Sequence, residues 1–141
     1  MELKRQGEQV ESLKADFYHR SEAIVGGAQA TAYPVNNETL SAGSVFTSDD
    51  LRGANGVPSV AVGVWGMLYG NAGTVGASLF IGSADGTPDE YSPRVDFWQA
   101  DFNSGLVMVE LGTGANAGKV SIKAFAGDIT DIYFWPVGWW K

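Results

Sequence analysis

The sequence predicts a mainly β protein: an antiparallel β-sandwich or jelly-roll-like head, preceded by a short N-terminal α-helix. Two observations lead to this fold class. Of the 19 glycines in the 141 residues, 18 follow residue 25, and glycine at about twice its usual frequency is typical of many tight turns. Short runs of β-branched and aromatic residues recur through the same part, with no helical pattern between them, which excludes a parallel α/β fold.

The first 24 residues read as a helix, because they lack proline and are rich in Glu, Lys, Gln and Arg. Leu3, Val10, Phe17 and Ile24 share one heptad position, and Leu13 occupies the second apolar position. The other residues at that second position are polar, so the apolar stripe is incomplete as a coiled coil. An isolated helix of this length is marginal in water. It is therefore expected to pack on its own head, on copies of itself in a small oligomer, or on a partner.

The composition changes near residue 25, from a charged segment to a glycine-rich one, and this change divides the chain into three segments. Residues 1–24 form the helix, residues 25–43 read as a small-residue linker, and residues 44–141 form the head.

Seven strands are expected in the head, at 44–48, 58–69, 77–82, 94–101, 106–111, 119–125 and 129–135. Residues 106–111 are nearly all apolar, which is typical of a strand covered on both faces. Trp65 and Trp98 fall within strand patterns and are assigned to the core.

The sequence contains few of the residue arrangements that catalysis requires. It contains no cysteine, and its one histidine, His19, lies in the predicted helix, away from any nucleophile of the head. Residues 112–119 suggest a phosphate-binding loop, but Thr113 stands where the motif needs glycine, and Val120 where it needs Ser or Thr. The segment is read instead as a hairpin loop.

Acidic residues give only a weak indication of a metal. Asp85, Asp89 and Glu90 offer oxygen ligands for calcium. Their spacing does not match an EF-hand, and an Asp-Gly pair followed by proline is ordinary turn chemistry. No pair of carboxylates is identified that would serve a glycosidase. The expectation is a protein that is not an enzyme and needs no metal or cofactor.

Charge narrows the range of partners. The net charge is −7 and the pI is about 4.5, which argues against nucleic acid and against anionic membranes as partners. The N-terminus has no apolar signal region, and no apolar run is long enough to span a bilayer. Synthesis in the cytosol is therefore expected.

The C-terminal tail is the most unusual segment, since Trp135, Trp139 and Trp140 lie within its last seven residues. So much apolar surface must be docked. One interpretation is that the tail covers the open end of the sandwich. A second makes it an anchor between subunits or to a partner, because tryptophan is favoured at binding hot spots. A third is a platform for sugars.

As a whole, a charged N-terminal helix, a small-residue linker and a glycine- and aromatic-rich β head resemble bacteriophage virion proteins of the capsid decoration (cement), head-fibre and fibre-knob kinds. The resemblance implies a homotrimer on the virion surface that is bound to the major capsid protein. Leu3, Val10, Leu13, Phe17, Ile24, Trp135, Trp139 and Trp140 are the expected oligomer or partner interface. The alternative expectation is a carbohydrate- or receptor-binding head of a phage fibre.

Overall fold

The computed structural model describes residues 34–141, with the side chain of Asn55 excepted. The helix predicted over 1–24, with Leu3, Val10, Leu13, Phe17 and Ile24, lies outside the described residues. The strands are β1 (Glu38–Leu40), β2 (Val45–Thr47), β3 (Gly63–Ala72), β4 (Ser78–Ser83), β5 (Arg94–Asp96), β6 (Phe102–Glu110), β7 (Val120–Phe125) and β8 (Ile129–Trp140). Two single-turn 3₁₀ helices, η2 (Gly53–Asn55) and η3 (Gly114–Asn116), lie in the connections.

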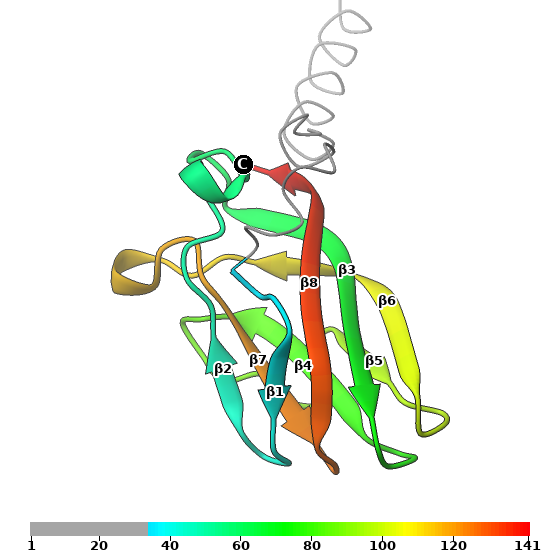
Figure 1. Ribbon diagram of the computed structural model, residues 1–141. Coiled ribbons are helices and arrows are strands. Elements are labelled where there is room, and N and C mark those ends of the chain that lie inside the picture. Colours follow the sequence, from blue (N-terminus) through cyan, green and yellow to red (C-terminus); the bar gives the residue numbers. More distant parts are fainter. Residues whose placement is uncertain (1–33) are drawn as a thin grey trace, which may run out of the picture.

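The strands form two antiparallel four-stranded sheets packed as a sandwich (Figure 1). Sheet A has the order β1-β8-β3-β6, and sheet B has the order β2-β7-β4-β5. The first strand therefore pairs with the last, the second with the seventh, the third with the sixth and the fourth with the fifth. This nested pairing, alternating between two sheets, is the jelly-roll arrangement. The predicted fold class of the head is confirmed.

The connections gather at the two ends of the sandwich. Because neighbouring strands are antiparallel, the β1–β2, β3–β4, β5–β6 and β7–β8 connections share one end. The longer β2–β3, β4–β5 and β6–β7 connections share the other end, where the chain also terminates (Figure 1). We refer to this second end as the loop end.

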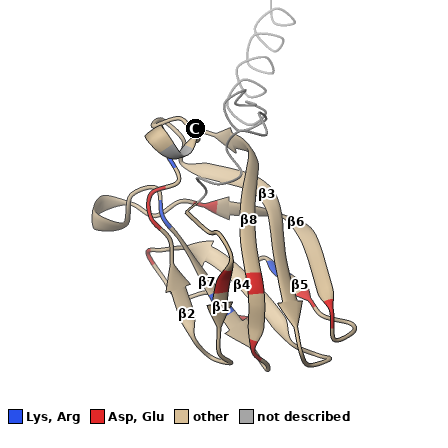
Figure 2. Ribbon diagram, in the orientation of Figure 1, with Lys and Arg blue, Asp and Glu red and all other residues tan. Residues whose placement is uncertain are grey.

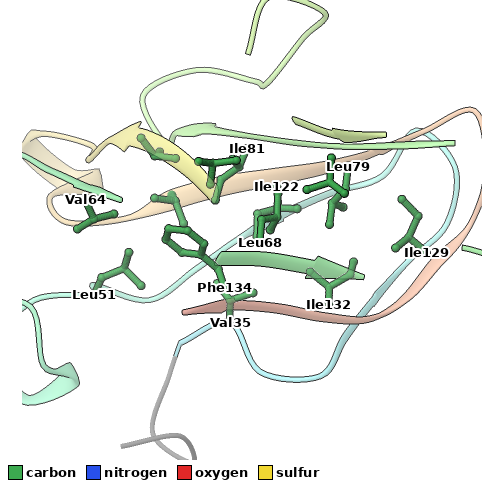
Figure 3. Packing of buried hydrophobic residues seen from close by; sticks show 14 of the residues in the cluster. Val35, Leu51, Val64, Leu68, Leu79, Ile81, Ile122, Ile129, Ile132 and Phe134 are labelled. Carbon is green, nitrogen blue, oxygen red and sulfur yellow. The ribbon is translucent and has the colours of Figure 1, made fainter. Parts of the chain in front are cut away.

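The core lies between the sheets and follows from residue alternation along each strand. Leu68 and Phe134 of sheet A face Leu79 and Ile122 of sheet B, and all four are buried (Figure 3). On each of these strands, the residues that alternate with the core residues point to the opposite face of the sheet. The inner faces therefore explain why these strands form, and the outer faces are left for other contacts.

The head begins before residue 44. β1 lies in the segment that the sequence predicts to be a linker, and it pairs with β8 at the edge of sheet A. Val35 is also buried in the core, and its carbonyl accepts a hydrogen bond from the backbone N–H of Phe134. The boundary predicted at 44 is therefore wrong. The sequence does not reveal β1, because a three-residue strand is too short to show a period of two.

The C-terminal tail is part of the sheet itself. β8 continues through Trp140 and lies between β1 and β3 in sheet A, so the tail does not cover the open end of the sandwich. Residues 112–119 also differ from the hairpin loop predicted for them. They connect β6 of sheet A with β7 of sheet B, two strands that do not pair with each other.

Three predictions of burial are wrong. Trp65 is only half-buried, lies on the outer face of sheet A and does not belong to the core cluster. Trp98 is 82% exposed, because β5 ends at Asp96 and Trp98 belongs to the connection that follows it. The strand predicted over 106–111 is covered on one face only, since Val107 and Val109 are buried whereas Leu106 and Met108 are exposed.

Candidate functional site: an aromatic face on sheet A

The outer face of sheet A collects large apolar side chains from three adjacent strands. We call these residues the aromatic face: Trp65, Met67 and Tyr69 of β3; Phe102, Leu106 and Met108 of β6; Tyr133, Trp135 and Trp140 of β8. Most of them alternate with core residues, so sheet A is apolar on both sides. A sheet with one face in water normally carries polar residues there.

Strand register brings these side chains side by side. Trp65 lies opposite Met108, and Met67 lies between Leu106 on β6 and Trp135 on β8. Side chains directly opposite on antiparallel strands are in contact distance. The aromatic face is therefore continuous across the strands and is not a scatter of single apolar residues.

Aromatic contacts connect the middle of the face. The ring centroid of Trp135 lies 5.5 Å from that of Tyr69 and 5.7 Å from that of Tyr133. Tyr69 in turn lies 6.1 Å from Phe102. Tilted pairs at these separations are favourable for aromatic quadrupoles, so the rings form a linked group.

Glycines make room for two further indoles. Trp65 and Trp140 have ring planes within 9° of parallel and centroids 6.3 Å apart. Each covers a glycine on the neighbouring strand: a Cβ at Gly138 would overlap the ring of Trp65, and a Cβ at Gly63 would overlap the ring of Trp140. Glycine is therefore required at both positions, because an indole ring lies directly against the backbone there.

We expect Gly138→Ala to displace Trp65 and to change the near-ultraviolet circular dichroism of the tryptophans, while the far-ultraviolet spectrum stays that of the wild type. Crowding of this kind costs about 1–3 kcal/mol. The matched control is Gly73→Ala, because a Cβ there meets nothing within 4 Å. Identical near-ultraviolet spectra for the two variants would contradict the placement of Trp65 over Gly138.

The face is half-buried on β3 and β8, exposed on β6, and almost without charge. Leu106, Met108 and Phe102 are 65%, 60% and 50% exposed, and all three lie on β6, an edge strand of sheet A. β3 contains no charged residue, β6 carries only Glu110 at its end, and β8 carries only Asp131 near its start (Figure 2). Apolar patches beyond a few hundred Å² are unusual on monomers and mark contact surfaces. A long apolar edge strand is also a template for pairing with another chain.

The structure separates the three predicted interface tryptophans. Trp135 and Trp140 lie on the aromatic face, and the indole N–H of Trp135 is buried with no acceptor among the described residues. Trp139 is only 8% exposed and belongs to the core cluster. Its assignment to an interface is wrong, because successive residues of a strand point to opposite faces.

Sequence reasoning missed Met67, Tyr69, Phe102, Leu106 and Met108. Their signal was present as apolar residues on both faces of two strands. For residues 106–111 this pattern predicts a strand covered on both faces. Residues 34–141 form only two layers, and no described element covers the outer face of sheet A, so the same pattern indicates apolar surface outside the core.

A cavity adjoins the aromatic face at the loop end. Its volume is about 420 Å³, and Trp140, Glu110, Arg52, Val62 and Thr113 are among its lining residues. Trp140 and Glu110 flank Gly63 on the two neighbouring strands. Backbone hydrogen bonds from Val62 to Trp140 and from Leu111 to Val62, both 2.9 Å, hold its walls together.

Arg52 is held in place by Asp50. Its Nε and Nη2 atoms donate to the two carboxylate oxygens of Asp50 at 3.1 and 3.2 Å, and Nη1 donates to the carbonyl of Ser59 at 3.2 Å. Burial opposes the ionised form of Asp50, but hydrogen bonds and charge from Arg52, with a contribution from Lys119, outweigh it and lower the pKa of Asp50.

The lowered pKa predicts an acid-sensitive loop end. A carboxylate with a depressed folded pKa stabilises the fold above its unfolded pKa, and that stability is lost as the pH falls through the folded value. We expect chemical denaturation to show stability falling below about pH 4, with a smaller fall in Asp50→Asn. An unchanged pH dependence in that variant would contradict this role of Asp50, and Asp49→Asn serves as the control.

The acidic turn, which gives only a weak indication of calcium in the sequence, makes contacts within and between loops. Asp85 accepts hydrogen bonds from the N–H and Oγ of Thr113, which lower its pKa. Asp89 accepts from the N–H of Tyr91. Within residues 34–141 no group of three or more His, Cys, Asp or Glu is placed to hold a metal ion.

Comparison with known proteins gives no relative. No family model, no curated protein and no solved structure matches this chain. Among the described residues, no helix is long and apolar enough to cross a membrane.

Proposed function

We propose that this chain is a non-enzymatic structural protein that self-associates through the aromatic face and acts by attachment alone. The observation that carries the proposal is the continuous apolar surface across β8, β3 and β6, whose only charged residues are Asp131 on β8 and Glu110 on β6, near the ends of the strands. Its occupants are the same faces of the other copies of this head in one oligomer.

The composition of the face supports self-association. A stable interface buries about 800 Å² on each partner and is enriched at its core in Trp, Tyr, Phe and Met. The aromatic face contains six aromatic residues and two methionines on three neighbouring strands. This composition is that of an interface core and not of a solvated surface.

The distribution of charge supports a copy of the same chain as the occupant. Each chain carries a net charge of −7, so two copies repel each other through most of their surfaces. Within the aromatic face, β3 contributes no charged residue, β6 contributes only Glu110 and β8 contributes only Asp131. Contact between two such faces leaves the repelling carboxylates at the rim.

The N-terminal sequence supports the same arrangement. Leu3, Val10, Phe17 and Ile24 recur at one heptad position, and packing on copies of itself in a small oligomer is one arrangement that buries such a stripe. The phage resemblance then suggests a homotrimer on a capsid lattice, as a decoration or cement protein. Several weak sites on one oligomer bind a repeated lattice firmly, because binding of the second site is intramolecular.

Multi-angle light scattering of the full-length protein tests the proposal. We expect a mass three times that of the 15.0 kDa chain, unchanged on dilution through the micromolar range. A monomer at every concentration would overturn it. A dimer would retain the face as a self-association surface and overturn the trimer.

A further inference from the structure

We infer that the cavity at the loop end binds a neutral sugar ring. This inference goes beyond the proposed function and does not depend on it. The cavity lies past the end of the aromatic face, where the β2–β3 and β6–β7 connections meet the last residue of β8. Its volume of about 420 Å³ falls in the range of small-molecule sites, about 300–1,000 Å³.

One side of the cavity is apolar. The indole of Trp140 and the exposed side chain of Val62 line it. Trp140 is fixed in place, because its ring covers Gly63 and lies parallel to that of Trp65. A pre-positioned aromatic ring favours a ligand with an apolar face, as the C–H face of a pyranose provides.

The other lining groups are directional and polar. Arg52 has five N–H donors, of which three are engaged by Asp50 and Ser59. The carboxylate of Glu110 only accepts hydrogen bonds. Among the described residues no ion pair joins Arg52 to Glu110. A hydroxyl both donates and accepts, so a ring with several hydroxyls satisfies the two groups together.

The charges that line the cavity favour a neutral ligand over an anion or a zwitterion. The carboxylate of Asp50 already neutralises Arg52, which leaves Glu110 as the uncompensated charge among the five lining residues named above. An anion would meet Glu110 and a chain of net charge −7. A zwitterion would need a free cation for its carboxylate, and Arg52 is not free. A neutral polyol requires neither.

A printed array of glucose-, galactose-, mannose- and N-acetylglucosamine-containing glycans, with sialylated counterparts, tests the inference on the full chain. We expect binding to at least one neutral glycan. Isothermal titration with that glycan is expected to show at least a tenfold loss of affinity in Glu110→Ala. Glu90→Ala, which removes the same charge from an exposed loop residue, is expected to bind as the wild type does.

Each other result counts against the site. Absence of binding by folded wild-type protein, a preference for sialylated glycans, or equal affinity in Glu110→Ala and the wild type would overturn it. Trp140→Leu gives a second reading where its melting curve shows a folded protein, and a loss of at least tenfold is again expected. Light scattering of Glu110→Ala separates this result from self-association, because its mass is expected to equal that of the wild type.

Discussion

Replacing Leu106 and Met108 together by aspartate is expected to convert the oligomer to a 15.0 kDa monomer. The two are the most exposed side chains of the aromatic face. On the same face of β6 they lie opposite Met67 and Trp65. Burying an unpaired carboxylate at a contact between copies costs several kcal/mol, which exceeds the contribution of most single contacts to an interface. In the monomer both positions face water, so folding is expected to be retained.

The matched control carries the same charge on other surfaces. Val45→Asp and Val75→Asp together add two carboxylates at exposed valines, one on β2 of sheet B and one in the β3–β4 connection. Light scattering is expected to give the wild-type mass for this pair. If both double variants dissociate, added charge and not the aromatic face controls the assembly. If neither dissociates, the face is not the contact.

Phe134→Ala is expected to cause the largest loss of stability, about 3–5 kcal/mol. Phe134 is fully buried on β8, where sheet A meets sheet B (Figure 3). Truncation leaves a cavity that the strands cannot close without breaking the pairing of β8 with β3 and β1. Because folded domains are only marginally stable, such a loss is a large share of the total free energy of unfolding.

Urea denaturation at one fixed protein concentration measures this effect, since association and unfolding are linked. Val137→Ala is the control, because Val137 lies on the same strand and is exposed. Its expected cost is below about 0.5 kcal/mol. A Phe134→Ala midpoint equal to that of Val137→Ala would contradict the two-sheet core.

Most of the fold of the head follows from the sequence. Periods of two at residues such as Val120, Ile122 and Ala124 fix the inner face of a strand, and these residues are buried. β1 was not predicted, because three residues cannot show a period. The partner of each strand was not predictable either, because the nested jelly-roll pairing depends on contacts between residues far apart in the chain.

The candidate site was predicted only in part. The excess of tryptophan in the tail indicated Trp135 and Trp140, but it also included Trp139, since the side each residue faces depends on the register of β8. Leu106 and Met108 were assigned to a covered strand because apolar character alone does not distinguish a core from an interface. Only the two-layer architecture shows that no part of the described head covers them.

Hydroxyl-radical footprinting tests the central claim most directly, because it reports the exposure of single side chains in solution. In the wild type we predict that Met108 is oxidised at least tenfold more slowly than in Leu106→Asp, while Trp98 reacts equally in both. Met108 and Trp98 are both exposed within the described residues 34–141, so protection confined to Met108, in a protein whose light-scattering mass exceeds that of one chain, shows that another copy covers the aromatic face. Equal oxidation of Met108 in the two proteins would contradict the account.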